Sequence, residues 1–238
     1  MEEKELKTSP KQRIFISLIA IIMLGSMIAS YVAIVMNGNN SSDSSNEIDP
    51  AKIEQYSAAY DKELEEFHEA SKGDFAKYSE YLGEVRTFDE AAANEGGVKT
   101  RDIVVGDGKE LAEGDTNYLA YYVGFCADGS VFDSSLNDKD NPTAFDKALN
   151  ASLGMIEGWN TGVVGMKLGG IRKITIPGEL AYGDKMEICG GYNKPLRFLV
   201  MAVANEDPLK TAASEVDTAF MKLQYAYYGI DYDTQMGQ

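Results

Sequence analysis

The residues of this chain that could carry chemistry are mainly aromatic and aliphatic, and they gather in two segments. The first, YVGFCADGSVFDSS, runs from Tyr122 to Ser135. The second, GMIEGWNTGVVGMKLGGIRKITIPGELAYG, runs from Gly154 to Gly183 and contains Trp159, the one tryptophan of the chain. Large apolar side chains with few polar groups among them suit the binding of an apolar ligand better than acid-base chemistry.

Several common catalytic centres find little support in the sequence. His68 is the single histidine and lies among glutamates, so a histidine-based triad or a zinc site with several imidazoles is nearly excluded. No nucleotide-binding loop is recognisable, since Lys167 follows Met166 rather than the required glycine. No pair of carboxylates stands out by its spacing as a centre for glycoside hydrolysis. We therefore expect neither a cofactor nor a metal ion.

In this order, the two segments resemble the FKBP-type peptidyl-prolyl cis-trans isomerases. The resemblance spans about Gly97 to Val203 and includes the motifs GMKLGG and TIPGELAYG. It implies an α+β fold, in which a bent antiparallel β-sheet wraps over one short helix. It also implies an enzyme, a peptidyl-prolyl cis-trans isomerase, whose partners are proline-containing polypeptides.

Rotation about a prolyl amide suits an apolar pocket. The rotation costs about 18 to 20 kcal/mol because it breaks amide resonance, yet no covalent bond forms or breaks. The planar amide has the larger charge separation, so a cavity that strips its water favours the twisted state. A ten-thousandfold acceleration needs only about 5.5 kcal/mol, which desolvation and one or two hydrogen bonds can supply.

The resemblance assigns an apolar pocket to four aromatic residues. Trp159 forms the floor on which the proline ring rests, and the walls are Tyr122, Phe132 and Phe198. Taken singly, an aromatic residue on a strand is more often part of a core. Taken together and in order, with the motifs between them, these residues favour the family interpretation.

The resemblance also assigns the helix entry and the polar contacts. Met155 and Ile156 match the Val-Ile pair of the family, in which the second residue contacts the ligand through its backbone. Asp133 matches the pocket carboxylate, and Tyr182 matches the tyrosine whose hydroxyl donates to the substrate carbonyl. Together with Tyr122, these two polar residues are the expected catalytic groups.

Two departures from the family pattern bear on turnover. Thr143 falls where a pocket phenylalanine often occurs, and the loop 184–192, DKMEICGGY, lacks the usual Ile-Pro-Pro ending. Ile188 is the candidate for the apolar contact of this loop. A non-catalytic FKBP-fold chaperone or client-binding module is therefore the alternative function.

The elements that position these residues can be predicted from periodicity and turn residues. One helix is expected near Glu157 to Val164, and the isomerase domain is placed at 94–206. Strands clustered around a single helix indicate an α+β domain built on an antiparallel sheet. The expected strands are Val98–Val105, Thr116–Cys126, Val131–Asp133, Ile171–Pro177 and Leu196–Val203.

Helical segments flank this domain. Asp49-Pro50 supplies an N-cap and a first-turn proline, and an apolar stripe at spacings of three and four follows. Lys72–Asp74 interrupts the stripe, so 51–93 is predicted to be a stalk or a hairpin of two helices. A C-terminal amphipathic helix is predicted in 207–238. These faces must bury on one another, on the domain, or on another copy of the chain, and the last alternative motivates the hypothesis of a homodimer.

An uncharged, mostly apolar run predicts a transmembrane helix at 14–36. As a helix this run spans about 34 Å, against about 30 Å for the hydrocarbon core. Basic residues precede it in 1–13 and none follows until Lys52, so we expect a cytoplasmic N-terminus and an extracytoplasmic isomerase domain. A cleaved signal peptide is the alternative, although its apolar region is usually only about 7 to 15 residues long. The polar segment 37–50 is predicted to be a flexible linker.

Charge and cysteine content limit the partners further. The net charge of −16, with no basic stripe, excludes nucleic acid as a main partner. The two cysteines, Cys126 and Cys189, are compatible with one disulfide bond in an oxidising compartment or with two small buried side chains. Sequence separation leaves these alternatives open.

Overall fold

The computed structural model describes residues 48–83, 86–206 and 208–236. These residues belong to one of the two units into which the chain divides, residues 47–238. Within this described part, no helix combines the length and the apolar character needed to cross a membrane. The predicted transmembrane segment 14–36 lies outside the described residues.

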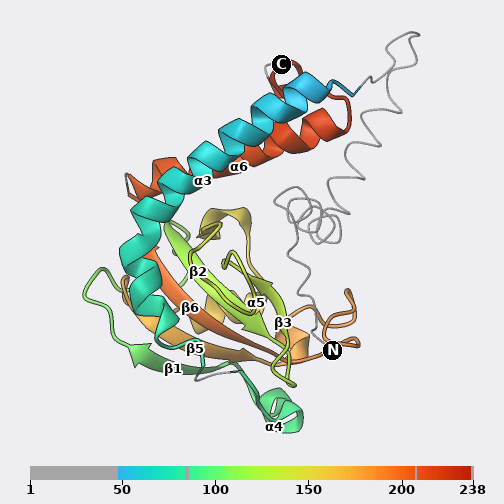
Figure 1. The fold of residues 1–238 in the computed structure, drawn as a ribbon. Coiled ribbons are helices and arrows are strands. Elements are labelled where there is room, and N and C mark those ends of the chain that lie inside the picture. Colours follow the sequence, from blue (N-terminus) through green and yellow to red (C-terminus); the bar gives the residue numbers. More distant parts are fainter. Residues whose placement is uncertain (1–47, 84–85, 207, 237–238) are drawn as a thin grey trace, which may run out of the picture. The chain divides into compact units, whose positions relative to one another are not determined.

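A six-stranded antiparallel sheet forms the centre of the unit, with the strand order β1-β5-β6-β2-β3 and β4 paired with β2 (Figure 1). The five predicted strands are confirmed. The two residues of β4 were not predicted, because so short a segment shows no alternation. The strands are β1 (Lys99–Val104), β2 (Tyr118–Phe125), β3 (Val131–Ser134), β4 (Leu149–Asn150), β5 (Ile171–Ile176) and β6 (Leu196–Ala204).

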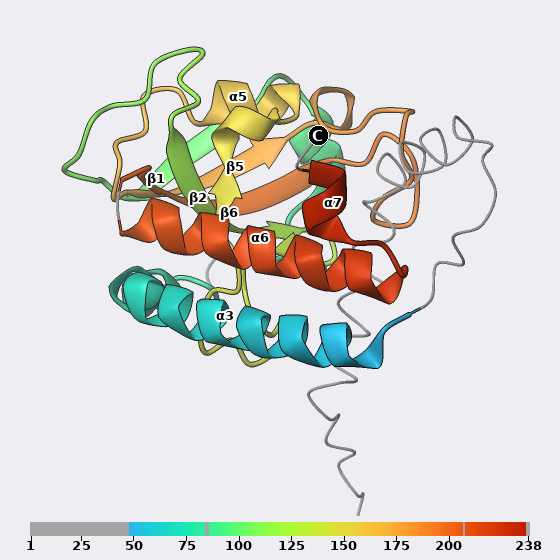
Figure 2. The ribbon, with the colours of Figure 1, turned by 90° about the horizontal axis from the view of Figure 1, so that it is seen from above.

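Helices cover the two faces of the sheet unequally. The short helix α5 (Glu157–Gly162) lies on one face, and α3 (Pro50–Ser79) and α6 (Leu209–Tyr227) lie side by side on the other (Figure 2). An antiparallel sheet over one short helix was predicted and is confirmed. The shorter helices are α4 (Glu90–Asn94) and α7 (Tyr232–Met236), and single 3-10 turns occur at Ala151–Leu153 and Gly178–Leu180.

Strand β2 shows why the sheet has two cores, since all eight of its residues are buried. Successive side chains of a strand point to opposite faces. Tyr118, Ala120 and Tyr122 enter a cluster with Trp159, which we call the aromatic core. Leu119, Tyr121, Val123 and Phe125 enter a second cluster with residues of α3 and α6, which we call the helical core.

The predicted interruption of the N-terminal helix at Lys72–Asp74 is wrong, because α3 is one continuous helix of 30 residues. Glycine inside a helix costs only about 1 kcal/mol relative to alanine. Phe67 and Tyr78, which lie on opposite sides of Gly73, are both fully buried in the helical core. The Tyr78 hydroxyl also donates to the Leu199 carbonyl oxygen at 2.9 Å. Burial on both sides of the glycine therefore outweighs its local preference.

The amphipathic helices bury their apolar stripes within the chain. Tyr60 of α3 contacts Phe220 of α6 with ring centroids 5.8 Å apart, and Val216 of α6 is buried in the helical core. Phe145 is fully buried there as well and stacks on Tyr121 at 3.8 Å. The faces that motivated the hypothesis of a homodimer are thus occupied by the sheet and by each other.

Candidate functional site

The site is built on a cluster of four aromatic rings in the aromatic core. Trp159 of α5 contacts Phe198 of β6 and Tyr122 of β2 edge-to-face, with centroid distances of 5.3 and 5.8 Å. Phe132 of β3 contacts Phe198 in the same way at 5.6 Å. Such edge-to-face pairs add about 0.5 to 1.5 kcal/mol each beyond their buried area. The structure therefore brings the four predicted aromatic residues together.

Two glycines set the position of the indole. Gly158 and Gly162 face β5, where an added Cβ would overlap the side chains of Ile176 and Ile174 respectively. Their small size lets α5 approach the sheet closely. The indole Nε1 then donates to the Tyr118 hydroxyl at 3.0 Å in the buried interior. This hydrogen bond orients the ring and satisfies its only polar atom.

Gly124 of β2 has a comparable role at the wall of the site. An added Cβ would lie 2.6 Å from the Phe132 ring and 3.0 Å from the Phe198 ring. A glycine inside a strand often marks such a close approach. That signal was available in the segment YVGF, but the sequence analysis did not use it.

The polar end of the site is organised around Asp133 of β3. Its carboxylate accepts a short hydrogen bond from the Tyr122 hydroxyl and another from the Ser134 amide at 2.8 Å. The Lys147 ammonium lies 3.3 Å from the same carboxylate and 5.9 Å from the centre of the Tyr122 ring. Lys147 was missed by the sequence analysis, since nothing in its local sequence indicates a partner at Asp133.

These contacts hold the hydroxyl of Tyr122 in its protonated form. Burial raises the pKa of Tyr122 far above its ordinary value, and the neighbouring Asp133 carboxylate raises this pKa further. The Asp133 carboxylate has three partners inside the protein. The pair is therefore arranged to fix side chains in place rather than to exchange a proton with a ligand.

Tyr182 supplies the second hydroxyl of the site. Its half-buried ring packs against the aromatic core, and burial followed by the Asp133 carboxylate raises the pKa of Tyr182 above its ordinary value. Among the described residues, its hydroxyl makes no hydrogen bond. The protonated hydroxyl is therefore available to donate to a ligand.

The rim of the site is apolar. Met155 and Ile156, the residues that lead into α5, are half-buried and pack against the aromatic core, as does Ile188 from the loop 184–192. Trp159 retains an exposed fraction of 2% beneath this rim. Contact between a ligand ring and the indole therefore requires the side chains that cover Trp159 to move.

A disulfide bond between Cys126 and Cys189 ties the loop 184–192 to the end of β2. The sequence left this bond open, because the two residues are 63 positions apart. Within the loop, Ile188 and Gly191 exchange backbone hydrogen bonds of 2.9 and 3.1 Å. The loop at the rim is thus fixed covalently and by its own backbone.

Thr143 contributes no wall to the site. It is exposed, and its hydroxyl accepts a hydrogen bond from the Asn137 side-chain amide at 2.8 Å. Asn137 also accepts one from the Thr143 backbone amide at 3.0 Å. The position that often carries a pocket phenylalanine in the family is used here to close a surface loop.

A single group of acidic residues in the described part of the chain could in principle surround a cation. It consists of Glu63, Glu66 and Glu215 on α3 and α6, with ligand atoms within 4.8 Å of one another. The group lies on the helices and contains no residue of the aromatic core. Glu66 already pairs with Lys62 at 2.8 Å. It is therefore no part of the candidate site.

Known proteins resemble the part of the chain that carries the aromatic cluster. The family described as "FKBP-type peptidyl-prolyl cis-trans isomerase" matches residues 108–201. A "FK506-binding protein" of Neisseria meningitidis serogroup B is 42% identical over 91 residues, covering 37% of this chain and 76% of the relative. The serogroup A protein of the same name is 38% identical over 111 residues, covering 45% and 93%.

Some relatives are much longer than the matched region. "FK506-binding protein 4" of Gibberella zeae is 42% identical over 89 residues, which cover 37% of this chain but 17% of the relative. The shorter relatives match along most of their own length. The family match over residues 108–201 contains the four residues of the aromatic cluster. The chain belongs to the FKBP-type peptidyl-prolyl cis-trans isomerases.

Proposed function

We propose that this chain accelerates cis-trans rotation about X-Pro bonds of unfolded or exported polypeptides on the extracytoplasmic side of a membrane. One observation carries the proposal: the protonated hydroxyl of Tyr182, which has no hydrogen-bond partner among the described residues, lies at the rim of a buried aromatic cluster. The aromatic rings suit a proline ring, and the hydroxyl suits the carbonyl of the bond that rotates.

The mechanism that this geometry supports needs no covalent step. The proline ring packs on Trp159 between Tyr122, Phe132 and Phe198, and the prolyl amide loses its water. Loss of water disfavours the planar amide because the planar form has the larger charge separation. Tyr182 donates to the substrate carbonyl oxygen, while Asp133 fixes the hydroxyl of Tyr122. Met155, Ile156 and Ile188 complete the apolar rim.

The membrane anchor and the location are parts of the same proposal. The apolar run 14–36 with basic residues before it supports a single crossing with the N-terminus in the cytoplasm. The Cys126–Cys189 bond supports an oxidising, extracytoplasmic compartment for the domain. Alkylation of the protein in intact cells tests this location. Two free thiols that react in the native protein would contradict it.

Refolding of a substrate protein that is limited by an X-Pro bond tests the activity. Uncatalysed isomerisation takes about 10 to 100 s, and we expect the 238-residue chain to shorten this phase at substoichiometric concentration. The same experiment separates the alternative, a non-catalytic chaperone. If the slow phase keeps its rate while aggregation of the substrate protein is suppressed, the chaperone interpretation stands and the enzymatic one fails.

A further inference from the structure

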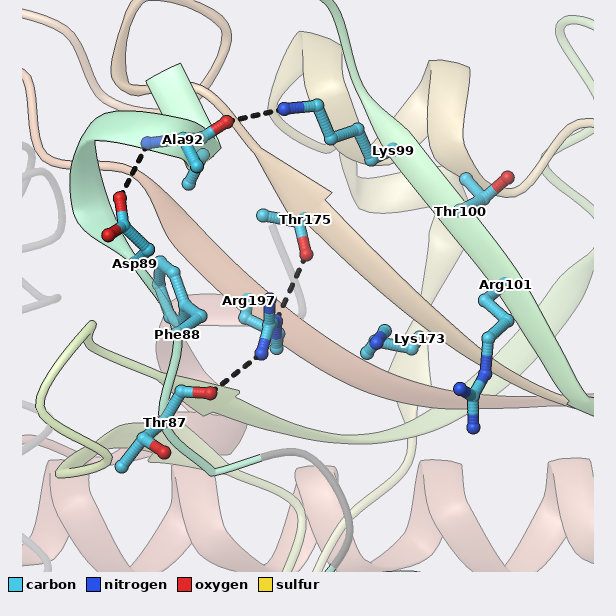
Figure 3. A pocket seen from close by; sticks show the side chains of 11 residues that line it. Thr87, Phe88, Asp89, Ala92, Lys99, Thr100, Arg101, Lys173, Thr175 and Arg197 are labelled. Atoms are coloured by element: carbon cyan, nitrogen blue, oxygen red, sulfur yellow. Dashed lines mark hydrogen bonds between the residues drawn. The ribbon is translucent and has the colours of Figure 1, made fainter. Parts of the chain in front are cut away.

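A cavity of about 440 Å³ is lined by residues of β1, β5, β6 and α4 and of the segment that leads into α4 (Figure 3). Successive residues of a strand point to opposite faces. Arg197 lines this cavity while its neighbour Phe198 lies in the aromatic core, and Thr175 lines it while Ile174 lies in the aromatic core. The cavity is therefore separated from the candidate isomerase site by the sheet itself.

Positive charge dominates the wall of this cavity, although the whole chain has a net charge of −16. The cations come from three neighbouring strands, and register places Lys99 beside Thr175 and Arg101 beside Lys173. In the next pair of strands, Thr175 lies beside Arg197. The basic residues of the wall are Lys99, Arg101, Lys173 and Arg197.

Among the described residues, Lys173 and Arg197 of this wall have no acidic partner. Asp89 is the only acidic residue among the described ones that line the cavity, and its carboxylate accepts from the Ala92 amide at 2.7 Å as the N-cap of α4. Asp102 of β1 pairs instead with Arg172, at 2.6 and 3.0 Å, beside the C-terminal end of α5. The positive charges of Lys173 and Arg197 are therefore not paired with a carboxylate among the described residues.

Arg197 is held in place before any ligand arrives. Its Nε donates to the Thr175 hydroxyl at 3.0 Å, and its Nη1 donates to the Thr87 carbonyl oxygen at 2.9 Å. The guanidinium also lies over the Phe88 ring, 4.4 Å from its centre. Among the described residues, no acceptor binds Nη2. A fixed guanidinium with a free edge is a strong binder of carboxylates, because little side-chain entropy is lost.

Lys173 lies between Arg197 and Arg101 in this wall (Figure 3). Among the described residues it has neither an acidic partner nor a hydrogen-bond acceptor. Burial lowers the pKa of Lys173, and the positive charges of Arg197 and Arg101 lower it further. An anion in the cavity would relieve this repulsion.

We propose that this cavity binds an acidic segment of a polypeptide in extended conformation, with its carboxylates on Lys173 and Arg197. The site is independent of the proposed isomerase function. Lys173 and Arg197 are diagonal neighbours on β5 and β6, since Lys173 pairs with Leu199 and Thr175 pairs with Arg197. Such diagonal neighbours lie about 7 to 8 Å apart, which is close to the two-residue repeat of an extended peptide.

Protection of the sheet edge alone does not account for the charges. Lysine on an edge strand commonly prevents unwanted pairing, which would explain Lys99. Lys173 and Arg197, however, lie on the interior strands β5 and β6. A nucleic acid or a membrane surface would bring many negative charges against a chain of net charge −16, whereas a short peptide brings few.

A proline-free peptide of alternating glutamate and threonine tests the proposal, with fluorescence anisotropy of the 238-residue chain in non-ionic detergent as the measurement. The peptide in which glutamine replaces glutamate should bind at least about tenfold more weakly. Lys173→Gln should weaken binding of the acidic peptide about tenfold. The matched control is Lys222→Gln, which makes the same change of net charge on α6, where Lys222 pairs with Asp233 at 2.9 Å.

The outcomes separate this proposal from its rivals and from the isomerase function. Equal affinity for both peptides, or equal losses from Lys173→Gln and Lys222→Gln, would overturn the proposal. It would also be overturned if vesicles with anionic phospholipid or a single-stranded oligonucleotide bound more tightly than the peptide and lost affinity with Lys173→Gln. Tyr182→Phe should leave acidic-peptide binding unchanged, and Lys173→Gln should leave isomerisation of a neutral substrate unchanged. Loss of acidic-peptide binding and loss of isomerase activity can therefore be observed separately.

Discussion

Replacement of Tyr182 by phenylalanine separates the proposed chemistry from protein stability. Among the described residues, its hydroxyl makes no hydrogen bond, so Tyr182→Phe should change the free energy of unfolding by less than about 0.5 kcal/mol. A neutral hydrogen bond to the substrate contributes about 0.5 to 1.5 kcal/mol net. Its loss should therefore lower kcat/KM by about 2- to 12-fold.

Tyr122→Phe is the informative comparison. Its hydroxyl donates to the Asp133 carboxylate, so the variant leaves a half-buried carboxylate with the Ser134 amide and the Lys147 ammonium as its remaining partners. Hydrogen bonds to charged groups contribute about 1.5 to 3 kcal/mol when they are buried. Because Asp133 retains 29% of its side-chain exposure, we expect a loss near the lower end, about 1 to 2 kcal/mol of unfolding free energy.

Three measurements on the 238-residue chain test the roles of the Tyr182 and Tyr122 hydroxyls. They are kcat/KM on a tetrapeptide with one X-Pro bond, the rate of proline-limited refolding, and unfolding by denaturant. Tyr227→Phe is the matched control, since Tyr227 is exposed on α6 away from the aromatic core. Unchanged kcat/KM in Tyr182→Phe would refute the assigned hydroxyl role. A loss of stability as large as that of Tyr122→Phe would show that the Tyr182 hydroxyl has a partner inside the protein.

Three further outcomes follow from the structure. Trp159→Ala should lower the free energy of unfolding by about 3 to 5 kcal/mol and abolish binding of an apolar pocket ligand, and calorimetric titration with unchanged affinity would move the site elsewhere. Reduction of the Cys126–Cys189 bond, which closes a long loop, should cost about 2 to 4 kcal/mol, measured as a lower denaturant midpoint with reductant, and an unchanged midpoint would contradict this. The hydrogen bond from Lys52 Nζ to the Asp231 carboxylate, at 2.6 Å, is the main cause that lowers the pKa of Asp231 to about 2. Since this folded pKa is below the unfolded value, the stabilisation should be present above about pH 4 and lost as pH falls through about 2. Asp231→Asn should therefore differ from the original chain at pH 5 but not below pH 2, and an NMR titration midpoint near 4 for Asp231 would refute the pairing.

Much of the site could be predicted, because the local sequence patterns and the order of the family motifs along the chain indicate the same fold. The strands β2 and β6 are short runs of mainly apolar residues, so they can be located from the local sequence, as can the helix that carries Trp159. The eight residues assigned by resemblance are found either in the aromatic core or bonded to it. Their roles in turnover stay predictions until the variants above are measured.

Other parts of the site could not be predicted, because they depend on partners distant in the sequence. Lys147 reaches Asp133 through a loop whose course has no periodic signal. In the sequence, nothing distinguishes Tyr118 from the other aromatic residues of β2. Only the packing of α5 shows that its hydroxyl accepts the hydrogen bond from the Trp159 indole. The continuity of α3 through Gly73 also depends on burial against the sheet, which outweighs the local cost of glycine.

The sequence by itself determined the family, the positions of the main strands along the chain and the identity of the aromatic residues. These features depend on residue type and short-range spacing. Only the tertiary structure decided that Cys126 meets Cys189, that α3 and α6 cover the second face of the sheet, and that Lys173 and Arg197 share one cavity. These contacts depend on strand register and helix packing. These bring together groups far apart in the chain, and the free energy of such contacts comes from burial and charge rather than from local conformational preference.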